Sequence, residues 1–203
     1  AIFTPEAEIQ NGVQKQLEIK MDPDDANMQV IMRVKNITEA PKEFSIWGLT
    51  VSAQDGTVIV PMNDNDTGLL HNRNISVWPY TDLSDSRLHF GNHYVTLHQD
   101  RNNQQSFKLG FNLNDAEVYY CVGEDIFRKA FETNHPIEKY PDGGCSFEMF
   151  TNSSFVEIES LSPLKTVRAG ETVSLTEHWS ILKKPCEVDF KNDSSIDNMF
   201  DKL

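Results

Sequence analysis

Residues 140–179 read YPDGGCSFEMFTNSSFVEIESLSPLKTVRAGETVSLTEHW. Gly, Asn-Ser and Pro divide this stretch into three extended segments that are rich in β-branched and aromatic residues. Four glutamates lie inside the segments and not in the turns: Glu148, Glu157, Glu159 and Glu177. A strand normally carries carboxylates on a solvated face, so the stretch predicts a sheet with one apolar face and one acidic, accessible face. The acidic face is the candidate working surface.

The rest of the chain repeats the extended pattern, with no helical period between the runs. Alternating segments bounded by turn residues predict strands at 13–20, 28–34, 44–51, 57–60, 90–98, 106–113, 118–122 and 126–131. Asp55 and Gly56 predict a hairpin turn between two of these strands. The fold class is therefore all-β and antiparallel, with roughly ten to fourteen short strands that form a sandwich of two sheets.

No repeat or linker divides the chain. One domain over residues 1–203 is expected, with a structured core at about 9–182. The polar tail, 183–203, could dock a short helix through Met199 and Phe200, but the pattern favours a frayed end.

Composition limits the partners. The formal net charge is −13, which disfavours nucleic acid and an anionic membrane surface because few cations could replace their counterions. No apolar run approaches the ~20 residues that span a bilayer. Three cysteines without metal spacing suggest unpaired thiols in a reducing, cytoplasmic compartment, although five Asn-x-Ser/Thr sequons would fit a periplasmic or secreted protein.

Residues 70–82 combine a polar loop with large rings. Arg73 offers a fork of donors and Asp82 a bidentate acceptor, while Trp78 and Tyr80 present aromatic faces. This mixture suits a polyhydroxyl ligand. The alternative is a structural loop whose rings plug the end of a sandwich.

Lys108 is the only basic residue in its predicted strand. It is either a solvated charge at the edge of the sheet or a partner for the acidic face.

Glu157 and Glu159 are spaced two apart, so their side chains project together. Like charges that close raise one pKa, which suits a general acid or base in a shielded site. The alternative is a solvated strand face or salt bridges to Lys108 and Arg73.

His178 lies between Glu177 and Trp179, so alternation places it on the opposite face from both neighbours. It is either a candidate acid or a core or edge histidine with satisfied hydrogen bonds. His89 and His93 would share a face only on a helix, which the extended pattern does not favour. No metal site and no cofactor are expected.

Seven short motifs occur in order: WPYTD (78–82), FKLG (107–110), YPDGG (140–144), FE (147–148), EIESLSPL (157–164), AGE (169–171) and TEHW (176–179). In combination they resemble a mainly bacterial branch of the galactose mutarotase-like, or aldose 1-epimerase-like, superfamily. The resemblance covers about residues 9–182. It implies a β-supersandwich of two sheets with a carbohydrate-sized cleft on its concave face.

Mutarotases open the sugar ring with a glutamate base and a histidine acid, and the resemblance puts Glu157 or Glu159 in the place of the base. The same resemblance puts Trp47 in the place of the acid histidine. An indole has no proton that exchanges near neutral pH, so this departure removes the general acid. The resemblance also implies that the chain lacks the N-terminal portion of the family fold, so open sheet edges and self-association are expected.

The leading hypothesis is a catalytically divergent carbohydrate-binding protein that takes a monosaccharide or small carbohydrate. Its expected binding residues are Trp47, Arg73, Trp78, Tyr80, Asp82, Lys108 and Glu148. The alternative is an isomerase of the aldose 1-epimerase type that uses Glu157 or Glu159 as base and His178 or a tyrosine as acid. A third possibility is a purely structural β-module.

Overall fold

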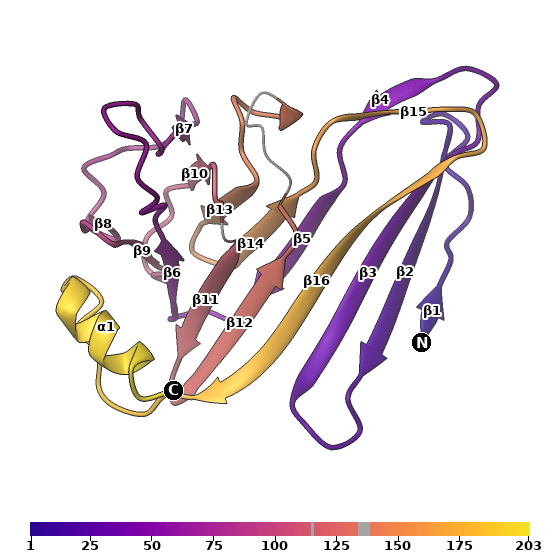
Figure 1. Ribbon diagram of the computed structural model, residues 1–203. Helices are drawn as coiled ribbons and strands as arrows, with labels where there is room; N and C mark the ends of the chain where they lie inside the picture. The colour runs from indigo at the N-terminus through magenta and orange to yellow at the C-terminus, as the bar shows by residue number, and fades with distance from the viewer. Residues whose placement is uncertain (115, 134–138) are drawn as a thin grey trace.

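Two large antiparallel sheets dominate the computed structural model, which describes residues 1–114, 116–133 and 139–203 (Figure 1). The nine-stranded sheet has the order β1 (Ile2–Phe3), β2 (Val13–Met21), β3 (Asn27–Asn36), β16 (Thr172–Lys183), β12 (Asp125–Phe131), β11 (Glu117–Val122), β6 (Thr57–Pro61), β9 (Tyr94–His98) and β8 (Leu88–Phe90). The five-stranded sheet has the order β5 (Trp47–Ser52), β14 (Val156–Leu161), β13 (Phe147–Thr151), β10 (Phe107–Phe111) and β7 (Ile75–Val77). A third, small sheet pairs β15 (Lys165–Val167) with β4 (Lys42–Phe44).

The main core lies between the two large sheets. Alternate residues of β10, namely Phe107, Leu109 and Phe111, are buried there. Val58 and Val118 of the nine-stranded sheet belong to the same cluster. Burial of such a cluster is the dominant stabilising contribution to folding, and it directs the alternate side chains of the five-stranded sheet to its outer face.

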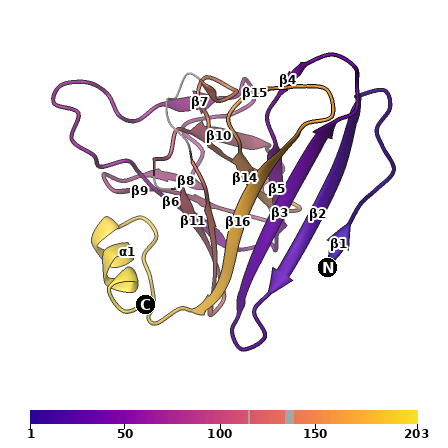
Figure 2. The ribbon, with the colours of Figure 1, turned by 45° about the vertical axis from the view of Figure 1, so that its right-hand side comes forward.

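A short helix, α1 (Asp193–Phe200), covers a second apolar cluster. Ile196 and Met199 are fully buried and pack with Ile59 and Cys121 of the nine-stranded sheet. In Figures 1 and 2, α1 lies beside β11 and β6, far from β1 and the N-terminus. The expectation of a frayed tail is therefore wrong, because the tail carries an apolar face that a solvated end would leave exposed.

Polar contacts also fix α1. The Asn192 side chain caps the helix by accepting a hydrogen bond from the backbone N–H of Ser194 at 3.0 Å. The Asp193 carboxylate accepts from the backbone N–H groups of Asn92 and His93 at 2.7 and 2.9 Å. As the only helix in the described ranges, α1 is too short to cross a membrane.

Asp55 and Gly56 form a turn, but the hairpin predicted there is wrong. Its two flanking strands belong to different sheets, since β5 pairs with β14 while β6 pairs with β11 and β9. The backbone N–H of Gly56 donates to the Tyr120 hydroxyl at 2.9 Å, which anchors the crossing between the sheets. Asp55 has a φ of 65°, as the turn residues of such a tight reversal often do.

Two predicted strands are each divided in the structure. The run 44–51 breaks where the Ile46 backbone N–H donates to the Ser162 hydroxyl at 2.8 Å, so β4 and β5 join different sheets. The run 90–98 breaks at Gly91, whose N–H donates to the carbonyl of Tyr94 at 2.8 Å. These divisions raise the strand count above the expected range, to sixteen in the described residues.

Candidate functional site

The outer face of the five-stranded sheet brings together residues that are distant in the chain. Glu148 of β13 lies opposite Glu159 of β14 and opposite Gly110 of β10. Lys108 projects from β10 on the side away from the core residue Leu109. Trp47 begins β5, which pairs with β14.

These side chains form the open cluster, which we define as Lys108, Glu148 and Glu159. The ammonium of Lys108 lies 2.7 Å from Glu148 Oε2 and 2.8 Å from Glu159 Oε2. The indole N–H of Trp47 donates to the same Glu159 oxygen at 2.6 Å. The other oxygens, Oε1 of Glu148 and Oε1 of Glu159, are buried and have no hydrogen-bond donor among the described residues.

The acidic face is present, but the prediction that it is accessible is wrong for three of its four carboxylates. Glu148, Glu159 and Glu177 are 2, 0 and 1% exposed, and Glu157 is half-buried. Lys108 is 8% exposed, so it is not a solvated edge charge. A lysine between two glutamates makes this burial possible, because buried charges persist only when they are paired.

Glu177 belongs to a different place, between the two sheets. There it forms the closed pair, defined as Lys129 and Glu177, with 2.9 Å between Lys129 Nζ and Glu177 Oε1. Lys129 is fully buried and also donates to the backbone oxygens of Gly48 and Ile158, each at 2.9 Å. Burial lowers the pKa of Lys129, and the attraction of Glu177 opposes that shift.

The surroundings of the open cluster shift the pKa values of its side chains. Burial raises the pKa of Glu148 to about 7, with further increases from Glu159 and from the neighbouring Asp142 carboxyl group, while Lys108 opposes the shift. Burial alone would lower the pKa of Lys108, but its hydrogen bonds to Glu148 and Glu159 raise it. Burial and then Glu159 raise the pKa of Glu157.

A pocket of about 290 Å³ opens above the open cluster. We call it the Lys108 pocket, and its lining residues are Ser45, Trp47, Trp78, Lys108, Pro141, Asp142, Glu148 and Leu161. The Lys108 ammonium lies 5.2 Å from the ring centre of Trp47 and 4.9 Å from that of Trp78. Two indoles therefore flank the cation, in the range of cation–π attraction.

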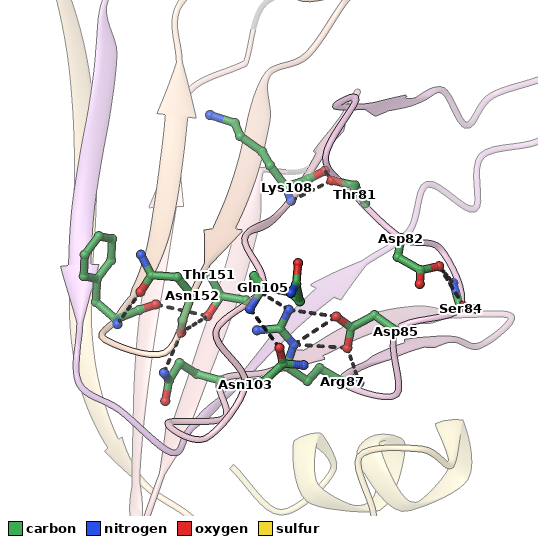
Figure 3. Close-up of polar contacts among 12 residues, drawn as sticks. Thr81, Asp82, Ser84, Asp85, Arg87, Asn103, Gln105, Lys108, Thr151 and Asn152 are labelled. Atoms are coloured by element: carbon green, nitrogen blue, oxygen red, sulfur yellow. Dashed lines mark hydrogen bonds and ion pairs between the residues drawn. The ribbon is translucent and has the colours of Figure 1, made fainter.

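The segment that carries Trp78 is tied to β10. Thr81 accepts from the backbone N–H of Lys108 at 2.9 Å and donates to its carbonyl at 2.7 Å, and Figure 3 shows the Lys108 side chain extending away from this contact. Further along the same loop, the buried Arg87 guanidinium binds the Asp85 carboxylate at 2.7 Å and the carbonyl of Gln105 at 2.9 Å (Figure 3). These contacts fix the loop that begins where β7 ends, so Trp78, the first residue after β7, is held over Lys108.

Two of the other expected site residues, Tyr80 and Glu157, lie close to the open cluster. Tyr80 is 48% exposed, and burial is the main cause of its raised pKa, although it also feels the charges of Lys108 and Glu159. Tyr80 and Glu157 therefore lie near the open cluster without lining the pocket.

Three expected residues lie elsewhere. Arg73 donates to the carbonyls of Asn63 and Asn92 at 2.7 and 2.8 Å, and it does not line the pocket. Asp82 is exposed and accepts from Ser84. His178 is exposed on the face of β16 opposite Glu177, so it cannot reach the open cluster. Arg73 and Asp82 are near Trp78 in the sequence, but the loop directs their side chains away from the pocket. His178 lies on the face that alternation predicts, opposite Glu177.

Asp142 was not among the residues expected from the sequence to bind. It lies at the pocket mouth with a φ of 52°, followed by Gly143 and Gly144 at 79° and 104°. An Asp before two glycines marks such a left-handed turn in the sequence, but only the fold shows what the turn faces. No group of three His, Cys, Asp or Glu side chains that could hold a metal occurs in the part of the chain that the structure describes.

No family model and no curated protein matches the sequence. Solved structures do match the fold. A galactose mutarotase-like protein from Lactobacillus casei aligns with a TM-score of 0.52 and 10% identity over 89% of this chain and 68% of its own. Candidate aldose 1-epimerases from Klebsiella pneumoniae and Escherichia coli align with TM-scores of 0.55 and 0.54, each at 10% identity.

These comparisons confirm the predicted fold class. The chain has the antiparallel, two-sheet β-sandwich of galactose mutarotase-like proteins. The alignments cover 89 and 90% of this chain but only 49 and 64% of the Klebsiella and Escherichia proteins. At such low identity the likeness is one of fold, so the chemistry must be argued from the residues of the Lys108 pocket.

Proposed function

We propose that this chain binds a small carbohydrate in the Lys108 pocket and is catalytically divergent from the mutarotases. The observation that carries the proposal is the open cluster, in which Glu148 lines the pocket and has an unused oxygen, while two indoles flank Lys108. Carboxylates accept hydrogen bonds from sugar hydroxyls, and aromatic faces pack against the C–H side of a sugar ring. The mutarotase-like fold of the neighbouring structures supports the same ligand class.

The dimensions of the pocket favour a small ligand. Its volume of about 290 Å³ is at the lower limit of ordinary small-molecule sites. A single sugar ring suits such a volume better than an oligosaccharide does. Trp47 is 54% exposed, so its ring offers free surface for stacking at the mouth of the pocket.

The proposed divergence from mutarotase catalysis depends on the general acid, which is a histidine in mutarotases. None of the described residues that line the pocket is a histidine. Trp47 stands near the carboxylates as a hydrogen-bond donor to Glu159, but an indole cannot deliver a proton at neutral pH. Carbohydrate binding without ring opening follows.

Saturation-transfer NMR and calorimetry against a panel of neutral, amino and acidic monosaccharides test the proposal. At least one sugar should bind, and Trp78→Ala should weaken binding about tenfold or more, as expected for loss of a stacking ring. Phe90→Ala is the matched control, because Phe90 is an exposed aromatic residue outside the pocket. The proposal fails if no sugar binds or if both variants reduce binding equally.

An aldose 1-epimerase activity is the second candidate, favoured by the raised pKa of Glu148. A carboxylate whose pKa lies near neutral can take the proton of an anomeric hydroxyl, so Glu148 suits the role of base better than Glu157, which does not line the pocket. Polarimetry with the pure anomers of galactose and glucose tests it. A rate equal to that of buffer, unchanged in Glu148→Gln and Glu159→Gln, excludes the activity.

A further inference from the structure

The Lys108 pocket has one positive charge too few. The single ammonium of Lys108 faces the carboxylates of both Glu148 and Glu159, so the pairing leaves one negative charge uncompensated when both are ionised. Each carboxylate uses one oxygen for Lys108, and each has a second oxygen, Oε1, that is buried without a donor. Buried acceptors of this kind are costly to leave unpaired.

Asp142 adds a third carboxylate at the mouth of the same pocket. Its backbone carbonyl accepts from the Ser76 hydroxyl at 2.6 Å, which holds the turn in place. The Asp142 carboxyl group also interacts with Glu148 and raises its pKa, as expected when two acidic groups approach each other. The mouth and the floor of the pocket therefore repel anions.

The aromatic walls already surround an ammonium group. Both Trp47 and Trp78 lie within about 5 Å of Lys108 Nζ, and Trp47 keeps 54% of its surface exposed. Indoles combined with carboxylates favour an organic cation over a neutral or anionic group. Among the described residues, Lys108 is the only cation that lines the pocket, and its charge is used by the two glutamates.

We propose that the Lys108 pocket selects an amino sugar with a free, protonated amine over neutral, N-acetylated and acidic sugars. The ammonium of the ligand would lie between Asp142 and Glu148 and supply the missing donor to Glu148, while the sugar ring packs on Trp47. This inference rests on the proposed carbohydrate binding and adds the class of sugar.

Calorimetric titration at about neutral pH and fixed ionic strength tests the inference, with glucosamine, glucose, N-acetylglucosamine and glucuronate as ligands and the galactose series in parallel. Glucosamine or galactosamine should bind about tenfold or more tightly than its neutral and N-acetylated counterparts, as expected for one charge-assisted contact. Glucuronate and galacturonate should bind weakest.

Asp142→Asn should remove most of this preference, and an asparagine fits the left-handed backbone at this position. Asp66→Asn is the matched control, because it removes the same charge from an exposed loop outside the pocket. The preference should persist in the control, which separates a local contact from attraction to the overall charge of −13.

The outcomes distinguish the two proposals. If neutral and amino sugars bind equally, or if an acidic sugar binds best, the amine selectivity is wrong while carbohydrate binding stands. If the preference persists unchanged in Asp142→Asn, the selectivity does not arise at this pocket and the inference is overturned. If no sugar of any class binds, both proposals fail together.

Discussion

Two buried lysine–glutamate clusters lie on opposite sides of β14, and they differ in whether their hydrogen bonds are complete. In the closed pair, Lys129 has donor contacts to Glu177, two backbone carbonyls and the Thr50 hydroxyl. Glu177 in turn accepts from Ser160 and from the Trp179 indole. Charge and hydrogen bonds are balanced within the closed pair.

The open cluster lacks this balance. One ammonium serves two carboxylates, two acceptor oxygens have no donor among the described residues, and a pocket lies above. The contrast teaches that burial of charge alone does not mark a functional site. An incomplete set of partners beside a pocket does, because a ligand can supply what the protein leaves out.

Removing the carboxylate of the closed pair has the largest expected effect. In Glu177→Gln the buried Lys129 ammonium has no counter-charge, and the free energy of unfolding should fall by about 3–5 kcal/mol. Glu177 opposes the lowering of the Lys129 pKa by burial, so the pKa falls further in the variant. The unfolded variant then binds more protons than its native state, and the loss should shrink as pH rises. Urea unfolding across a pH series measures both effects.

Glu117→Gln provides the control for that variant. Glu117 pairs with Arg128 through partly exposed side chains, so its loss should cost only about 0–1 kcal/mol. Equal losses in the two variants would mean that the closed pair contributes no more than a surface pair.

The next largest effect is expected on removing the cation of the open cluster. Lys108→Met leaves Glu148 and Glu159 side by side, and the free energy of unfolding should fall by about 3 kcal/mol at neutral pH. The carboxyl pKa values rise without Lys108, so the native state binds more protons and the loss should be smaller in acid. Lys183→Met is the control, because Lys183 is exposed and should have no measurable effect on stability. A loss in Lys108→Met that is independent of pH would contradict this account.

Glu148→Gln should move stability in the opposite direction. The pKa of Glu148 rises from 4.5 to about 7 on folding, so the native state binds more protons than the unfolded state between these values. Wild-type stability should therefore fall as pH rises through this window. The variant lacks this loss, and above the window it should be more stable than wild type by about 1–3 kcal/mol. Thermal unfolding at a series of pH values measures the difference, and parallel curves for the two proteins would refute it.

The smallest effect is expected for the indole contacts. Trp47→Phe removes the hydrogen bond to Glu159 while keeping an aromatic ring, at a cost of about 1 kcal/mol because the ring is half exposed. Trp179→Phe removes the matching bond to Glu177 in the closed pair, and should cost about 2 kcal/mol because the Trp179 indole is less exposed than that of Trp47. A larger loss in Trp47→Phe would reverse the distinction between the two clusters.

Part of the site could be predicted from single residues and their spacing. Alternation correctly places Glu157 and Glu159 on one face of β14 and puts His178 opposite Glu177. It could not show that Glu148 lies opposite Glu159, because that depends on the register between β13 and β14. The exposure of the acidic face was wrongly predicted for the same reason, since Lys108 comes from a third strand.

The C-terminal tail and the turn at Asp55 also show what local sequence predicts and what depends on tertiary packing. Asn192 caps α1, and Ile196 and Met199 form its buried face. A helix this short is stable only when its apolar face packs against another element, here the nine-stranded sheet. Asp55 and Gly56 correctly predict a turn, but the choice of partner for each flanking strand depends on the packing of both sheets.

The sequence by itself determined the all-β class, most strand positions and the shared face of Glu157 and Glu159, because the two-residue period of a strand is a local property. Only the tertiary structure decided which carboxylates share a cation and which have unused oxygens beside a pocket. Those pairings join residues as distant as Lys108 and Glu159, 51 positions apart, and Trp47 and Glu159, 112 apart. Strand order, register and the loop over Lys108 bring them together, and no local pattern encodes these features.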